Sequence, residues 1–173
     1  WGSRRKLCPD ADLREMQAAA VDPEERINCS HTPSRAEFDR VLPMITPNSY
    51  QNLAELLAWT GARVGEALAM KVGAWNREQR ELSISGRDPR RARRGKVRTR
   101  PFPVVGRLGV LLDMLSAGRD ASEPMCGELA IQANSTLNEC LARACKRARV
   151  PRFTAHGIRR MVAMQVVDNG EAS

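Results

Sequence analysis

The chain has 173 residues, of which 42% are hydrophobic, enough to bury a sizeable core in one domain and to exclude disorder throughout. No apolar run is long enough for a membrane span, and no leader of basic and then apolar residues opens the chain, so we expect an intracellular protein. The five cysteines show no C-x-x-C pair, which favours buried thiols in a reducing compartment over disulfides or a zinc site.

The net charge of +8 is concentrated in two segments. Residues 86–100 contain seven arginines and one lysine against one aspartate, a local charge of +7. Residues 140–160 contain seven basic residues and no acidic one, another +7, so the rest of the chain carries −6. Such segregation is typical of a surface that binds a polyanion. The alternative is a solvated basic face without a ligand.

The N-terminal part separates from the rest by its composition. Residues 1–33 mix charges and turn formers around a short candidate helix at 11–20, and we expect an N-terminal segment or linker there. From Ser34 a capping box with Glu37 predicts a helix that prolines end. We therefore expect one domain over residues 34–173.

The next helix is predicted to break in its middle. Leucines at helical spacing follow Ser49, and Thr60-Gly61 then interrupts the pattern before a second short helix. This helix-break-helix places Arg63 at a helix start.

Alternating residues then predict a β-hairpin. Residues 82–84 and 97–105 have the two-residue period of strands, and an arginine-rich tip joins them. Leucines at 108–115 return to helical spacing until Gly118.

Two helices close the predicted fold. Asn134 or Ser135 is expected to cap the first, and Pro151 to stop it. Thr154 is expected to cap the last helix, and Asn169-Gly170 is expected to end it. The fold class is thus mainly α with a small antiparallel hairpin or sheet.

Two pairs of residues are candidates for chemistry. His156 and Arg159 lie three apart at the start of the last helix, on one face and near the positive end of its dipole, which suits a phosphate. Glu66 lies one turn after Arg63 and is placed to hold the guanidinium in a fixed pose for an oxyanion. Taken alone, the first pair is more typical of a solvated helix face, and the second is more typical of a surface ion pair.

The order of these blocks carries more weight than each block. A T-G-x-R-x-x-E-A-L block at 60–68, a strand-basic turn-strand segment at 82–105 and an H-x-x-R helix at 156–159 follow one another. From about Ser34 to Gly170 the chain resembles the catalytic domain of the tyrosine recombinase, or phage integrase, family. The resemblance implies the DNA breaking-rejoining fold, with Arg63, Lys96, His156 and Arg159 as catalytic residues and Glu66 as supporting acid. The candidate DNA contacts are Arg91, Arg93, Arg94, Arg98, Arg143, Arg147 and Arg160.

The resemblance also implies a reaction and its partners. Members cleave and rejoin strands of double-stranded DNA through a 3′-phosphotyrosine, without metal or other cofactor, and act as homotetramers on DNA. Arginine and histidine donors stabilise the phosphorane, and the lysine protonates the leaving 5′ oxygen. We expect an integrase of a mobile element, associated with DNA in a eukaryotic nucleus or in the bacterial cytoplasm and nucleoid.

The departures from the family pattern limit this prediction. Arg160 stands where the family often has histidine, and the sequence stops before the family's nucleophilic tyrosine. Tyr50 is the only tyrosine, lies ahead of Arg63, and is expected to be a packing residue. We therefore expect a fragment that is inactive alone. Two alternatives remain: a non-catalytic DNA-binding module derived from this fold, and a helical RNA-binding protein, which the 4% aromatic content disfavours.

Overall fold

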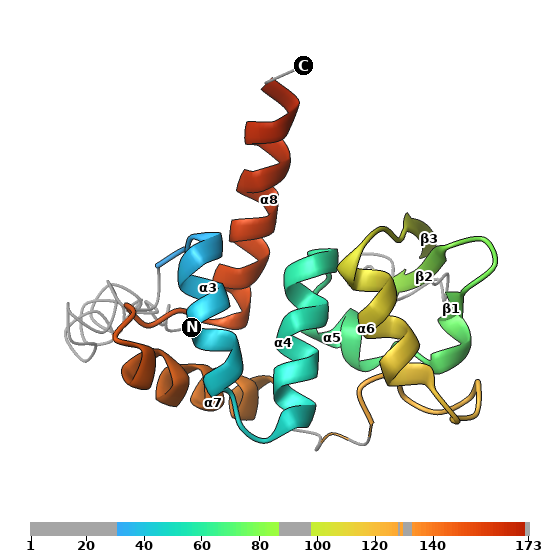
Figure 1. Cartoon of the computed structure of the whole chain (residues 1–173), viewed down its shortest axis with the longest axis horizontal. Helices are drawn as coiled ribbons and strands as arrows, with labels where there is room; N and C mark the ends of the chain where they lie inside the picture. The colour runs from blue at the N-terminus through green and yellow to red at the C-terminus, as the bar shows by residue number, and fades with distance from the viewer. Residues whose placement is uncertain (1–30, 87–97, 128, 130–132, 172–173) are drawn as a thin grey trace, which may run out of the picture.

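The computed structural model describes residues 31–86, 98–127, 129 and 133–171 (Figure 1). The helices are α3 (Arg35–Val41), α4 (Asn48–Thr60), α5 (Val64–Leu68), α6 (Arg107–Ser116), α7 (Ala133–Ala148) and α8 (Ala155–Glu171), with two short 3-10 helices, η1 (Leu42–Met44) and η2 (Val72–Ala74). The strands are β1 (Trp75–Asn76), β2 (Glu81–Gly86) and β3 (Arg98–Pro103). The predicted fold class, mainly helical with a small antiparallel sheet, is confirmed.

Helix α3 begins at the predicted capping box. The Ser34 hydroxyl accepts a hydrogen bond from the Glu37 backbone N–H at 3.2 Å, and the Ser34 N–H donates to the Glu37 carboxylate at 2.7 Å. These bonds satisfy N–H groups that have no partner inside the helix. The fixed start turns Phe38 and Val41 inward, where both are fully buried.

Helix α4 is the centre of the molecule. Figure 1 shows α3, α7 and α8 on one side of it and α5, α6 and the sheet on the other. Leu53, Leu56 and Leu57 are at most 1% exposed because α4 packs against elements on both sides. Each such leucine stabilises the fold by about 2 kcal/mol relative to an exposed one. Tyr50, in the first turn of α4, is 7% exposed within the same core, in agreement with its predicted packing role.

The predicted hairpin is confirmed as β2 and β3, which pair antiparallel from Glu81 opposite Pro103 to Gly86 opposite Arg98. Leu82 and Ile84 are buried on one face of β2, as its alternation predicts. The arginine-rich tip at 87–97 lies outside the described residues. The sequence did not predict β1, which adds a third strand beside β2.

Two predicted helix ends were wrong. Helix α7 begins at Ala133, so Asn134 and Ser135 lie in its first turn instead of capping it. Their side chains are exposed, where a polar residue costs a helix little. Helix α8 continues through Asn169 and Gly170 to Glu171, because glycine permits a helix stop but costs only about 1 kcal/mol inside a helix.

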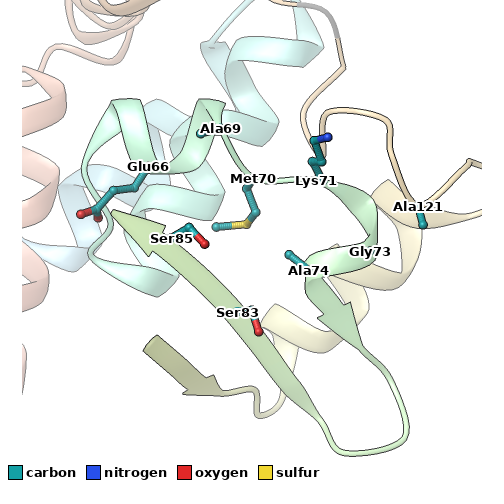
Figure 2. Close-up of a pocket in the computed structure, with 9 residues that line it drawn as sticks. All are labelled: Glu66, Ala69, Met70, Lys71, Gly73, Ala74, Ser83, Ser85 and Ala121. Atoms are coloured by element: carbon teal, nitrogen blue, oxygen red, sulfur yellow. The ribbon is translucent and has the colours of Figure 1, made fainter. Parts of the chain in front are cut away.

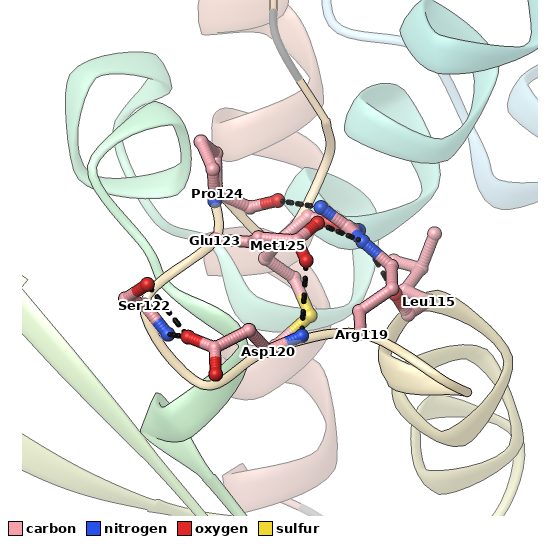
Figure 3. A network of polar contacts seen from close by, with 7 residues as sticks. All are labelled: Leu115, Arg119, Asp120, Ser122, Glu123, Pro124 and Met125. Atoms are coloured by element: carbon pink, nitrogen blue, oxygen red, sulfur yellow. Dashed lines mark hydrogen bonds and ion pairs between the residues drawn. The ribbon is translucent and has the colours of Figure 1, made fainter.

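The loop after α6 is fixed by one arginine (Figure 3). Arg119 donates to the backbone carbonyls of Leu115 and Met125 at 3.0 Å and of Pro124 at 2.6 Å, and pairs with Glu123 at 3.0 Å. The loop in turn bonds to the segment after α5, through Met125 N–H to the Met70 carbonyl at 2.8 Å. Arg119 thereby ties α6 to the chain that leads into the sheet.

The described cysteines agree with the prediction of buried thiols. Cys126, Cys140 and Cys145 are free and buried, and burial raises the pKa of the Cys126 thiol to about 12. In the part of the chain that the structure describes, no helix has both the length and the apolar character to cross a membrane. The division into a segment at 1–33 and a domain at 34–173 stays a prediction, since residues 1–30 are not described.

Candidate active site

The site begins at the break between α4 and α5. Gly61 ends α4 in the left-handed region, with φ +58°, and its N–H donates to the Leu57 carbonyl at 2.9 Å. The Thr60 hydroxyl donates to the Leu56 carbonyl at 2.7 Å and accepts from the Ala62 N–H at 3.2 Å. This turn ends α4 and begins α5 with three residues between them. It sets Arg63 at the N-cap of α5, as predicted.

Glu66 orients Arg63 as the sequence suggested. One carboxylate oxygen accepts from the Arg63 backbone N–H at 2.9 Å, and the other accepts from Arg63 Nη1 at 3.1 Å. The Glu66 side chain is 12% exposed, whereas that of Arg63 is 68% exposed. Glu66 is therefore mostly shielded from solvent, whereas the guanidinium that it holds faces solvent and has N–H donors that Glu66 does not use.

Arg159 reaches the same turn from α8. Its Nη1 donates to the Gly61 carbonyl, and Val162, one turn further along α8, packs against Gly61 so closely that an added Cβ would lie 3.1 Å from Val162 Cγ1. Arg63 and Arg159 are 96 positions apart in the sequence, yet Arg159 donates a hydrogen bond to Gly61, the residue two positions before Arg63. The partner of Arg159 is a neutral carbonyl, so its positive charge is not cancelled by that bond.

His156 lies in the first turn of α8, is exposed, and precedes Arg159 by three residues. The start of α8 is capped by protein groups: the Ala155 N–H donates to Asn138 at 3.0 Å, and the Gly157 N–H donates to the Thr154 hydroxyl at 3.4 Å. The helix start was predicted to be a phosphate seat. Because these two N–H groups are occupied, we expect the side chains of His156 and Arg159 to contribute to anion binding at this end of α8.

The sheet meets this cluster at the end of β2. Figure 2 shows the Glu66 carboxylate beside the arrowhead of β2. A Cβ at Gly86 would lie 2.8 Å from Glu66 Oε1, so the carboxylate occupies the space that a side chain would fill. An open groove of about 480 Å³ runs from Glu66 past Ser85 and Ser83 to Lys71 (Figure 2).

Arg100 on β3 is the one residue of the cluster that the sequence reasoning missed. Its Nη2 lies 3.8 Å from Glu66 Oε2, and its side chain is 53% exposed. The register places it opposite Ile84, on the sheet face that turns toward α5. Strand alternation within the basic hairpin was the signal that could have selected it.

The remaining predicted residues are scattered or not described. Lys96, Arg91, Arg93 and Arg94 lie outside the described residues, between Gly86 and Arg98, which pair with each other. Arg143 and Arg147 are exposed on α7, which packs against α3 and α8, and Arg160 is exposed on α8. Their contact with DNA stays a prediction.

The comparisons with known proteins give the class of fold first. A mainly helical chain with this three-stranded antiparallel sheet is similar to solved structures of an integrase and a recombinase. An integrase from mycobacterium phage Brujita matches with a TM-score of 0.58 and 17% identity, over 81% of this chain and 45% of that one. The XerA recombinase matches with a TM-score of 0.61 and 18% identity, over 82% of this chain and 51% of that one.

The fold therefore resembles the catalytic domain of tyrosine recombinases and integrases. The chain spans about half the length of these two structures. No family model matches the sequence, and no curated protein matches it.

Proposed function

We propose that this chain is the DNA-binding, phosphate-handling part of a site-specific tyrosine recombinase or integrase. The observation that carries the proposal is the bond from Arg159 to the Gly61 carbonyl, which brings the H-x-x-R helix to the turn that positions Arg63. The likeness to an integrase and a recombinase supports it through the fold. The proposed substrate is a phosphodiester of double-stranded DNA.

Arg63, His156 and Arg159 serve to stabilise the transition state. Attack on phosphorus produces a pentavalent phosphorane whose non-bridging oxygens carry more negative charge than the diester does. Donors fixed around those oxygens bind the transition state more strongly than the substrate and so accelerate the step. Glu66 contributes by holding Arg63 before DNA arrives, which lowers the cost of ordering its side chain.

The proposed step uses one nucleophile and one acid. A tyrosine hydroxyl loses its proton to water, its oxygen bonds to phosphorus, the bond to the 5′ oxygen breaks, and Lys96 donates the proton that this oxygen needs. The product is a 3′-phosphotyrosine, which keeps the energy of the broken bond for rejoining. The only tyrosine of this sequence, Tyr50, is buried in the core, so Tyr50 is not the proposed nucleophile.

Covalent trapping tests the proposal. The full-length protein is incubated with a pool of nicked duplexes, and protein linked to DNA is counted after denaturation. We expect adducts that Arg63→Ala and Arg159→Ala reduce by at least about a hundredfold, as loss of an oxyanion donor does. Arg77→Ala is the matched control. Arg77 pairs with Asp113 and follows β1 near Glu81, the first residue of β2, whereas Gly86 is the last residue of that strand. Adducts that form equally well without Arg63 or Arg159 would refute the assignment.

Sulfur substitution tests the role of Lys96. A 5′-bridging sulfur leaves as a thiolate and needs no proton, so Lys96→Ala should block cleavage of the ordinary strand but not of the sulfur-containing one. A variant equally defective on both substrates would show that Lys96 is not the general acid.

The alternative is a non-catalytic DNA-binding module of the same fold. The burial of Tyr50 favours it, because the one tyrosine of the sequence is then not accessible to attack phosphorus. Duplex binding by the full-length protein without any covalent adduct would establish this alternative.

A further inference from the structure

Arg100 shares its carboxylate partner with Arg63, but the two contacts differ in strength. Arg63 holds Glu66 by hydrogen bonds of 2.9 and 3.1 Å. Arg100 Nη2 is 3.8 Å from Glu66 Oε2, which is an ion pair beyond hydrogen-bond distance. Glu66 therefore keeps Arg100 nearby without taking up its N–H donors.

The position of Arg100 depends on a residue without a side chain. Arg100 and Gly86 lie on the sheet face toward α5, and the missing Cβ at Gly86 leaves room for Glu66 Oε1. Glu66 thus connects the turn that carries Arg63 with the strand that carries Arg100. Arg63 and Arg100 share the Glu66 carboxylate, and Arg159 bonds to the neutral Gly61 carbonyl in the turn before Arg63, which leaves an excess of positive charge.

We propose that Arg100 is a third arginine of this site and binds a phosphate oxygen of the DNA strand held by Arg63 and Arg159. Its side chain is 53% exposed, and a guanidinium offers five donors in a planar fork that fits a phosphate. The excess charge around Glu66 attracts a polyanion, and Arg100 then exchanges a loose ion pair for hydrogen bonds. This inference rests on the proposed function of the chain.

A purely structural role is the competing explanation. In that case Arg100 only supports Glu66, and its loss weakens DNA binding through a displaced Arg63. The two explanations differ in a variant that lacks the Glu66 charge. A phosphate contact by Arg100 persists in the Glu66→Gln background, whereas a supporting role has nothing left to support.

The experiment measures duplex DNA binding by this chain with fluorescence anisotropy at a series of salt concentrations. The variants are Arg100→Ala, Arg100→Lys, Glu66→Gln and the double variant Glu66→Gln with Arg100→Ala, and circular dichroism verifies that each is folded. Arg77→Ala is the control, because it removes one charge and one ion pair at the opposite end of β2.

We expect Arg100→Ala to weaken binding about tenfold and to reduce the slope of log K against log salt by about 0.9, as for one lost phosphate contact. The same reduction should appear in the Glu66→Gln background, Arg100→Lys should recover part of the slope, and Arg77→Ala should leave it unchanged. An Arg100→Ala variant that behaves like Arg77→Ala, or whose effect vanishes without Glu66, overturns the inference alone. A wild-type chain with no salt-dependent binding overturns the proposed function and this inference together.

Discussion

Replacing Gly61 by alanine should loosen the site without removing any of its charged groups. Gly61 has φ +58°, a conformation that costs a residue with a Cβ about 1–2 kcal/mol. The new methyl group would also lie 3.1 Å from Val162 Cγ1, a contact close enough to push α8 away from the turn. Overpacking of this kind costs about 1–3 kcal/mol.

The sum predicts that Gly61→Ala lowers the free energy of unfolding by about 2–5 kcal/mol. For a domain of this size this corresponds to a melting temperature lower by roughly 5–20 °C. Urea unfolding followed by circular dichroism measures the first quantity, and a thermal scan measures the second. DNA affinity should fall as well, because a displaced α8 weakens the bond from Arg159 to the Gly61 carbonyl.

Gly118 provides the matched control. Its φ is +69°, but no atom lies within 4 Å of an added Cβ, so Gly118→Ala should cost about 1–2 kcal/mol for the backbone alone. Combining Gly61→Ala with Val162→Ala should remove the steric part and leave a similar cost relative to Val162→Ala. A Gly61→Ala variant as stable as wild type, or one that Val162→Ala does not relieve, would refute this reasoning.

Three further predictions concern stability and reactivity away from the site. Burial raises the pKa of Cys126 to about 12, so this thiol should react slowly with alkylating reagents at pH 8 until urea unfolds the chain, and rapid labelling of Cys126 in the native protein would contradict this. Because the thiol of the unfolded chain ionises at a lower pH than the buried one, the free energy of unfolding should fall as the pH rises from 9 toward 12. The pKa of Glu37 is lowered, mainly by the hydrogen bond from the Ser34 backbone N–H, so the stabilisation from this capping box is present above pH 4.5 and lost as the pH falls below it. Between pH 7 and 3, the free energy of urea unfolding should therefore fall less in Glu37→Gln than in wild type, and an equal fall would contradict this. Arg119→Ala should destabilise the fold by about 2–3 kcal/mol, because it leaves backbone carbonyls of the loop without their donor, whereas Arg119→Lys should recover only part; unfolding midpoints equal to wild type would contradict this.

Sequence reasoning succeeded where the signal was local. The Ser34 capping box, the break at Thr60-Gly61 and the alternation of β2 each depend on residues within one turn or one strand. Such patterns are readable because the backbone satisfies them without help from distant parts of the chain. They were sufficient to predict the fold class.

The features that the sequence did not predict are not set by a local pattern. Strand β1 has only two residues, too few to show a period, and exists because Trp75 pairs with Leu82. Helix α8 passes the expected stop at Asn169-Gly170 because a glycine permits an end but does not require one. Residue composition and spacing do not decide such boundaries.

The candidate site divides in the same way. The motifs selected Arg63, Glu66 and Arg159, and the structure brings Arg159 to the turn before Arg63. The sequence did not predict Arg100 as a site residue, because its place beside Glu66 depends on β3 lying near α5 and on the room that Gly86 leaves there. The roles of Arg63, Glu66 and Arg159 remain predictions, as do those of His156 and Lys96.

The most direct measurement is a crystal structure of this chain bound to duplex DNA or to inorganic phosphate. We predict one phosphate whose oxygens lie about 3 Å from the guanidinium groups of both Arg63 and Arg159, with His156 within reach of the same group. A bound phosphate that contacts neither arginine, or two arginines that hold separate phosphates, would contradict the shared site on which the proposed function depends.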